Sequence, residues 1–129
     1  MLAGGFLGSG LGVSSVAAVV VELEGGVWKL VELNGKAVGG GGEVPTMQFD
    51  GGTHRVSGHS GVNRFGGVYE KAGEKLKFGP LMGTRMAGLP EAMQGERKFL
   101  AMLAAVTGWS VVDGELILSG SEGSGRFKR

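Results

Sequence analysis

The chain has 129 residues, enough for one folded domain and too few for two. Its formal net charge is +1, and it shows no basic stripe of the kind that nucleic-acid-binding proteins carry. The absence of cysteine excludes disulfides, thiolate nucleophiles and cysteine-based zinc sites. The 28 glycines, far above the usual share of roughly 7%, form no collagen repeat and favour an all-β protein with many tight turns.

Residues 1–24 are predicted to be a leader or a poorly ordered N-terminal segment, with one possible strand, and residues 25–129 to be the folded domain. No charge precedes Glu22, so a clear secretory signal is not present, and a degenerate export signal is the alternative. The apolar run is short and interrupted, so no transmembrane span is expected. The letters LAGG at residues 2–5 resemble a bacterial lipobox, but Gly5 stands where the lipid-modified cysteine would be.

Alternating apolar and polar residues predict short strands through the first two thirds of the chain. They lie at residues 27–33, 45–50, 53–58, 62–70 and 75–79, separated by turns that contain glycine. The strand at 62–70 contains Gly66 and Gly67, which we interpret as a bulge.

The apolar spacing then changes from two to three and four, which predicts one amphipathic helix. Pro90 suits its first turn, and Gly95 weakens its early part, so we expect the helix mainly over residues 96–106, closed by Gly108. Residues 109–120 read as a hairpin around Asp113 and Gly114, and a last strand follows.

This order of elements predicts the fold class. One helix cannot cover both faces of a broad sheet, so the strands are expected to curl into a small, mainly β, antiparallel open barrel with the amphipathic helix packed against it. We expect its interior to be filled by large apolar side chains. These are Trp28, Phe49, Phe65, Phe78 and Leu100.

A polar, glycine-containing stretch at residues 57–64 is the first candidate site. In one interpretation it is a recognition loop in which Arg64 binds an anion or a carboxylate. In the other, which we favour, the polar side chains hydrogen-bond the backbone of an irregular turn and the glycines supply unusual backbone angles. The residues concerned are Ser57, Gly58, Ser60, Gly61, Asn63 and Arg64.

The segment Thr84, Arg85 and Met86 is the second candidate, either as a structural clasp or as part of a binding site. Arg85 could pair with Glu91 or Glu96, and if it converges with Arg64 the two would form a basic rim for an acidic partner. Four methionines lie near the predicted helix, and we expect them to fill the core or, as the alternative, to line a site for an apolar ligand or a partner segment. They are Met82, Met86, Met93 and Met102.

No catalytic, cofactor or metal site is predicted. His54 and His59 are the only histidines, and their odd spacing along a strand would place them on opposite faces. Ser60 beside His59 lacks the third partner of a catalytic triad. The GGGGE stretch is followed by no Lys-Ser or Lys-Thr and is therefore not a phosphate-binding loop. We therefore expect a protein that is not an enzyme.

Several segments occur in an order that resembles a known family. From Trp28 to Arg129 the chain carries WKL, GHSGVNRFGGVY, LKFGPL, TRMAG, ERKFLAML, LIL and GRFKR, and this series resembles the META domain of HslJ-type bacterial heat-shock proteins. Members of this family commonly carry a cysteine in each of the motifs G-C-N and M-A-C. At these two cysteine positions this chain has Val62 and Gly88. The paired absence is expected if the two positions are neighbours in the fold.

The resemblance implies a lipocalin-like barrel with a packed helix, and no established enzymatic activity. It also implies a cell-envelope or periplasmic setting, often with a lipid anchor, and an association with heat stress and novobiocin resistance. We therefore expect a non-enzymatic, stress-associated domain that is a monomer and acts by binding a protein or a component of the cell envelope. The alternative is a carrier that holds a small apolar ligand inside the barrel.

Overall fold

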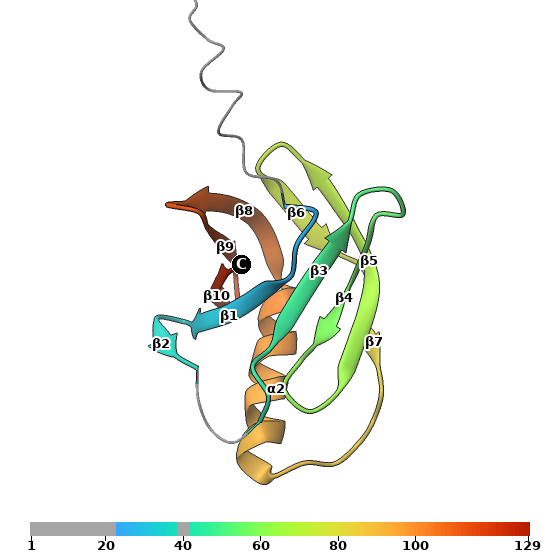
Figure 1. The fold of residues 1–129 in the computed structure, drawn as a ribbon, viewed down its shortest axis with the longest axis vertical. Coiled ribbons are helices and arrows are strands. Elements are labelled where there is room, and N and C mark those ends of the chain that lie inside the picture. The colour runs from blue at the N-terminus through green and yellow to red at the C-terminus, as the bar shows by residue number, and fades with distance from the viewer. Residues whose placement is uncertain (1–22, 39–41) are drawn as a thin grey trace, which may run out of the picture.

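The structure, a computed structural model, describes residues 23–38 and 42–129. Of the N-terminal segment predicted at residues 1–24, all but the last two residues lie outside the described part. The described chain forms ten strands and one helix (Figure 1). The elements are β1 (Trp28–Leu33), β2 (Lys36–Ala37), β3 (Thr46–Asp50), β4 (Arg55–His59), β5 (Arg64–Ala72), β6 (Lys75–Phe78), β7 (Met82–Gly83), α2 (Pro90–Ala104), β8 (Val106–Val112), β9 (Glu115–Gly120) and β10 (Gly123–Lys128).

The strands form an antiparallel barrel, which confirms the predicted fold class. The order along the sheet is β10-β9-β8-β6-β5-β4-β3-β1, and β10 also pairs with β1. The barrel is therefore closed rather than open, because Leu30 of β1 lies opposite Phe127 of β10. The short strands β2 and β7 each extend one side of this barrel, on β1 and β5 respectively.

Local sequence signals explain the hairpins. Asn34 and Gly35, and likewise Asp113 and Gly114, have positive φ angles, as a two-residue turn between twisted strands requires. The bulge predicted in β5 is wrong, because β5 pairs with β4 without a register shift. Gly67 instead permits a close approach, since a Cβ there would lie 2.8 Å from the carbonyl oxygen of Pro80.

Helix α2 begins at Pro90, which confirms the prediction for its first turn, and ends earlier than predicted. Pro90 occupies its first turn and Met93 donates its N–H to Leu89 O at 2.9 Å, so the helix forms despite Gly95. Gly108 does not close the helix but lies in β8, opposite Lys75 of β6. The apolar spacing predicted Val106 as part of the helix, but Val106 is the first residue of β8. Its side chain is buried and so continues the apolar pattern of the helix.

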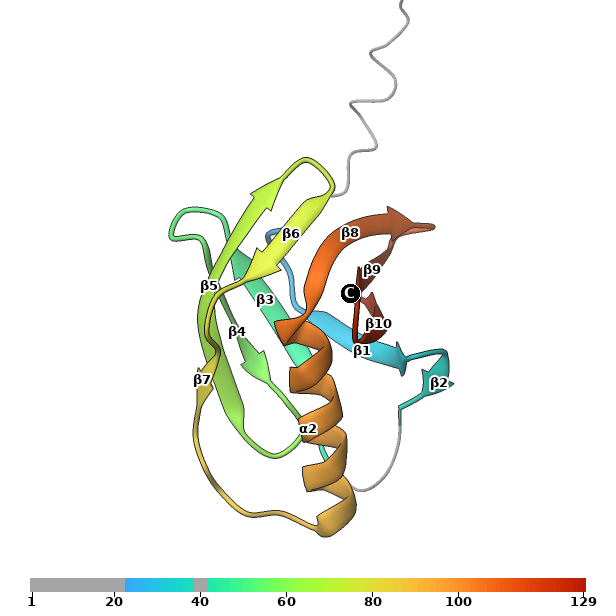
Figure 2. The same ribbon diagram turned by 180° about the vertical axis from the view of Figure 1, so that it is seen from behind.

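The helix stands between the β3–β5 strands and the β8–β10 strands in both views (Figures 1 and 2). Its Phe99 packs edge-on against Phe65 and Phe127, with ring centroids 6.0 and 6.2 Å apart. Of the predicted interior residues, Leu100 is only partly buried; the other four are buried. Within the described residues, no helix combines the length and the apolar character needed to cross a membrane.

Leu23 and Glu24, which belong to the predicted N-terminal segment, take part in the described fold. Leu23 is fully buried, and the indole of Trp28 donates to Leu23 O at 2.9 Å. The guanidinium of Arg129 lies 4.1 Å from the Trp28 ring centroid and also donates to Leu23 O and Glu24 O. The two ends of the domain therefore hold one another in place.

Candidate functional site

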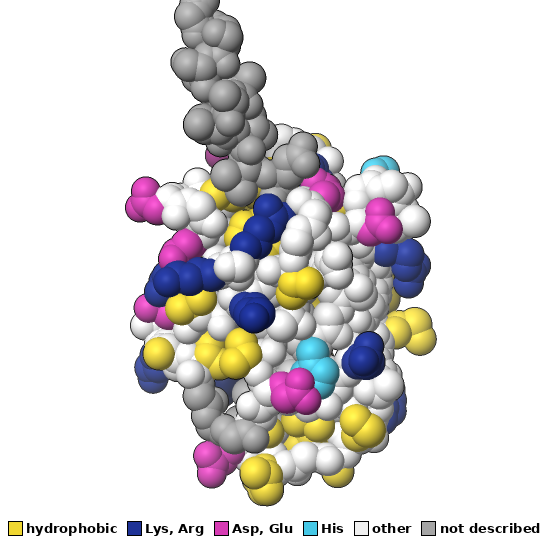
Figure 3. All heavy atoms as spheres, in the orientation of Figure 1, with side chains coloured by type: hydrophobic (Ala, Val, Ile, Leu, Met, Phe, Trp, Pro, Cys, Tyr) yellow, Lys and Arg dark blue, Asp and Glu magenta, His cyan; other side chains and the backbone are white. Residues whose placement is uncertain are grey.

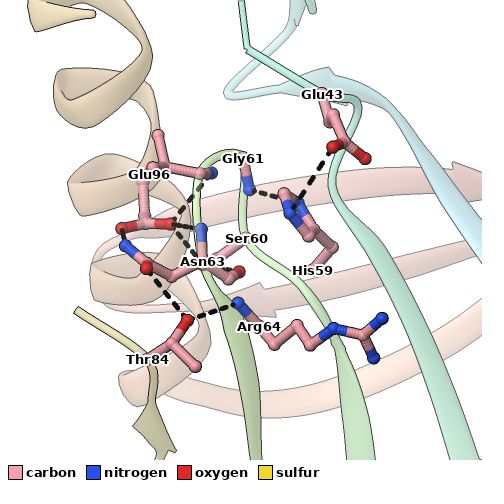
Figure 4. A network of polar contacts seen from close by, with 9 residues as sticks. Glu43, His59, Ser60, Gly61, Asn63, Arg64, Thr84 and Glu96 are labelled. Atoms are coloured by element: carbon pink, nitrogen blue, oxygen red, sulfur yellow. Dashed lines mark hydrogen bonds and ion pairs between the residues drawn. The ribbon is translucent and has the colours of Figure 1, made fainter. Parts of the chain in front are cut away.

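A buried glutamate on α2 organises the polar candidate residues. Glu96 is 7% exposed and lies on the buried face of the helix with Ala92 and Phe99. Its Oε2 accepts hydrogen bonds from Ser60 Oγ at 2.6 Å and from two backbone N–H groups, those of Val62 at 3.0 Å and Asn63 at 2.7 Å. Its Oε1 accepts one from Asn63 Nδ2 at 2.9 Å (Figure 4). The helix is thereby tied to the turn between β4 and β5.

Asn63 extends this network to the segment after β7. Its Oδ1 accepts hydrogen bonds from Thr84 Oγ1 at 2.9 Å and from the N–H of Met86 at 2.6 Å. Its Nδ2 also donates to Met86 O at 3.1 Å, and the N–H of Arg64 donates to Thr84 Oγ1 at 3.2 Å. We call Ser60, Asn63, Thr84 and Glu96 the clasp, because they join three segments that are distant in sequence.

The clasp keeps its carboxylate charged. Burial raises the pKa of Glu96, but hydrogen bonds from Ser60, Asn63 and the backbone outweigh burial and lower the pKa to about 2. A carboxylate that is already fully hydrogen-bonded and so weakly basic is poorly suited to accept a proton from a substrate. The arrangement is therefore a means of fixing loops rather than an acid–base centre.

The glycines of the first candidate stretch have separate roles. Gly61 has a φ angle of 123°, which other residues resist, and its position lets the turn pass close to Glu96. At Gly58 a Cβ would lie 1.9 Å from Thr46 O, so this glycine permits the close pairing of β3 and β4. Ser57 is exposed on β4 and takes no part in the clasp.

Both candidate arginines lie outside the clasp. Arg64 and Arg85 are exposed, and Figure 4 shows the Arg64 side chain extending away from Glu96. The predicted pairing of Arg85 with Glu91 or Glu96 is not found, and neither arginine forms an ion pair with any residue that the structure describes. Their guanidinium groups are therefore available to solvent.

The histidines do not form a metal site with one another. The Nδ1 of His59 accepts the N–H of Gly61 at 3.2 Å, and its Nε2 lies 3.9 Å from Glu43. His54 lies in the turn after β3, with its ring 6.1 Å from that of Tyr69. Within the described ranges, no group of three or more His, Asp or Glu is placed to hold a metal ion.

A groove of about 590 Å³ lies beside the clasp, between β6–β7 and α2. Its walls include Phe78 and Leu81 on the strand side and Leu100, Ala101 and Ala104 on the helix side. Arg64 and Arg85 also line it. The groove therefore combines apolar walls with the cationic side chain of Arg85, because the side chain of Arg64 extends away from Glu96, which also lines the groove.

The segment that borders this groove carries exposed apolar side chains. Met82, Met86 and Leu89 are 77%, 60% and 64% exposed, so the prediction that these methionines fill the core is wrong for Met82 and Met86. Met102 is fully buried and Met93 partly buried. Figure 3 shows hydrophobic side chains gathered at the end of the molecule where this segment leads into α2. We call residues 82–89 the apolar loop.

The sequence contained one usable signal for the residue at the centre of the clasp. Glu96 occupies the position that continues the apolar stripe of the helix from Ala92 to Phe99 and Leu103. A charged residue inside such a stripe must find buried partners, because an unpaired buried charge is costly. The candidate residues Ser60 and Asn63 are those partners.

Together these features define, over the described residues, a closed β-barrel with one packed helix and a polar clasp at one end. The META domain family profile matches residues 21–128, and the chain belongs to the META domain family. Val62 and Gly88 are indeed neighbours, since a Cβ on Gly88 would lie 3.6 Å from the Cβ of Val62.

Two solved structures have a similar fold. An NMR structure of a protein from Burkholderia xenovorans is 28% identical, with a TM-score of 0.65, and the alignment covers 83% of each chain. A second NMR structure is 23% identical with a TM-score of 0.64, and the alignment covers 79% of this chain and 86% of the other. At that identity the second likeness shows the fold alone. A search among curated proteins finds no match.

Proposed function

We propose that this META domain acts by binding a protein or another component of the cell envelope, and that the apolar loop is its contact surface. The envelope setting and the stress-associated role follow from the family resemblance. The proposed mode of action is binding rather than catalysis. The observation that carries the proposal is the exposure of Met82, Met86 and Leu89 within eight residues.

Exposed apolar groups of this density support an interaction surface. Single exposed hydrophobic side chains are ordinary on soluble proteins, but a contiguous group rimmed by polar residues marks a binding site. Methionine suits such a surface because its unbranched thioether side chain adapts to the shape of a partner. Arg85 lies between two of these residues and supplies a polar edge.

The clasp supports the proposal because it holds the apolar loop in one conformation. Both backbone groups of Met86 are bound by the Asn63 side chain, and that side chain is bound in turn by Glu96. A loop that is ordered before binding loses less conformational entropy when it meets a partner. In this proposal the polar candidate residues position the contact surface instead of touching the partner themselves.

The filled interior favours a contact surface on the outside over a ligand carried inside. Trp28, Phe49, Phe99 and Phe127 are each at most 2% exposed and occupy the barrel where a carrier would keep its cavity. The groove beside the clasp and a second hollow of about 330 Å³ between α2 and β1–β2 both open to the surface. A bound partner would therefore meet side chains at the barrel end, not in its centre.

The proposal is tested by comparing three immobilised proteins with the same bacterial envelope extract. The proteins are the wild type, the Met82→Glu/Met86→Glu variant and the matched control Val112→Glu, whose residue is also exposed but lies on the β8–β9 hairpin. We expect the wild type and the control to retain the same components and the double variant to lose them. Equal retention by all three would refute the proposal.

Native mass spectrometry of the three purified proteins addresses the carrier alternative. The proposed function predicts the mass of the bare chain in each case, since the interior is occupied by its own side chains. A copurified apolar molecule of constant mass, retained equally by the double variant, would favour the carrier instead.

A further inference from the structure

The barrel has a seam where two neighbouring strands separate. β6 and β8 pair at a single position, Lys75 with Gly108, and the N–H of Trp109 donates to Glu74 O beside it. By contrast, β8 and β9 pair along six positions. Beyond Lys75 the chain of β6 and β7 follows β5, while α2 occupies the space on its other side. The seam is therefore bordered by a strand on one side and a helix on the other.

Strand β7, which follows β6 at this seam, has one edge that pairs with no described strand. Among the described elements β7 pairs only with β5, through Gly83 with Phe65 and Met82 with Gly66. The N–H of Thr84 donates to Arg64 O at 3.1 Å, so the N–H of the preceding Gly83 points to the opposite edge, because successive backbone groups alternate between edges.

The groove at this edge has room for an added strand. Its volume is about 590 Å³, and the helix side presents the short side chains of Ala101 and Ala104. Pro80 lacks an N–H and so limits backbone pairing to the residues that follow it, from Leu81 to Arg85. Alternate side chains of an added strand would face the apolar wall at Phe78 and Leu81.

The free charge at the groove is positive. Arg85 lines the groove and forms no ion pair with any described residue, whereas the side chain of Arg64 extends away from Glu96. Glu96 also lines the groove, but its carboxylate is engaged by Ser60 and Asn63. A carboxylate group on the occupant would complement the Arg85 guanidinium.

We propose that the β7 edge accepts an extended, acidic segment of a partner protein, which adds to the sheet as an antiparallel or parallel strand between β7 and α2. This inference rests on the proposed function and names the partner's chemistry. Main-chain hydrogen bonds to Leu81, Gly83 and Arg85 give affinity, apolar residues at alternate positions enter the groove, and a carboxylate meets Arg85.

The test uses acetylated and amidated hexapeptides as probes. One alternates glutamate and valine, the second alternates lysine and valine, and the third is the glutamate peptide with its three central amides N-methylated. Backbone amide NMR of the full chain gives the affinity, the residues affected and the hydrogen-exchange rate of the Gly83 N–H.

We expect the glutamate peptide to bind at least about tenfold more tightly than either of the other two and to slow exchange at Gly83 by at least about tenfold. The Arg85→Gln variant is expected to lose about tenfold in affinity, whereas Arg55→Gln, at an exposed arginine on β4, is the matched control and keeps it. Unchanged exchange at Gly83 under saturation, equal binding of the N-methylated probe, or no binding at about 1 mM would overturn the inference.

The outcome is separable from that of the proposed function. If the hexapeptides fail but the Met82→Glu/Met86→Glu variant still loses its envelope component, strand addition is refuted and the apolar loop stands as the contact surface. If the double variant also retains every component, both proposals fall.

Discussion

Replacing Glu96 with glutamine tests the clasp most directly. The carboxyl pKa falls from the ordinary 4.5 to about 2 in the folded protein, even though burial alone would raise it. Since a difference of one in pKa corresponds to about 1.4 kcal/mol, the charged carboxylate contributes about 3 kcal/mol to folding at pH 7. The Glu96→Gln variant keeps the shape but turns an amide donor toward Asn63 Nδ2, itself a donor. We expect it to be less stable by about 3 kcal/mol.

The pH dependence separates the charge from the packing. A group whose folded pKa is depressed contributes fully above its unfolded pKa and loses that contribution as the pH falls toward its folded pKa. The difference between wild type and Glu96→Gln should therefore be constant above pH 4.5 and shrink progressively toward pH 2. Urea unfolding at several pH values measures this difference, and taking a difference cancels most contributions from other carboxyl groups.

Glu70→Gln is the matched control, because Glu70 is exposed on β5 and should change stability by no more than about 0.5 kcal/mol. A gap for Glu96→Gln below about 1 kcal/mol at pH 7, or one that stays the same down to the lowest pH, would refute the reasoning.

Three further changes have expected outcomes of known direction. The double variant Val62→Cys/Gly88→Cys should form a disulfide, since the Cβ atoms would lie 3.6 Å apart, and should gain up to about 3 kcal/mol in urea unfolding that a reductant removes. Gly58→Ala should lower the unfolding temperature and cost at least about 2 kcal/mol, because its Cβ would lie 1.9 Å from Thr46 O. Gly95→Ala should instead raise stability by about 0.5–1 kcal/mol, because nothing lies within 4 Å of that Cβ in the helix; a loss would contradict the assignment.

Local signals predicted most of the fold. Alternation located the longer strands but not the two-residue strands β2 and β7, and the Asp113–Gly114 pair located a hairpin. Both signals depend on neighbours in sequence. The end of α2 and the bulge at Gly66 and Gly67 were predicted wrongly, because both positions depend on contacts between residues that are distant in sequence. Val106 continues the helical stripe while pairing with Gly120, and Gly67 is shaped by the distant Pro80.

The sequence predicted several polar residues of the candidate site but not the glutamate at its centre. Ser60, Asn63 and Thr84 were selected as polar residues near glycine-rich turns, and the structure brings them together. Glu96 entered only as a possible partner of Arg85. Its position depends on how the helix packs into the barrel, which no local pattern specifies.

The clasp is also consistent with the absence of the cysteine pair that the family resemblance implies. Val62 and Gly88 lie on the same two segments that Asn63 already joins, through Thr84 and Met86. A disulfide there would cross-link loops that hydrogen bonds hold in any case, so its loss removes only the constraint on the unfolded chain. The apolar loop would keep its conformation without the disulfide, because Glu96 fixes Asn63 and Asn63 fixes Met86. The clasp, rather than a covalent bond, then determines how the contact surface is presented.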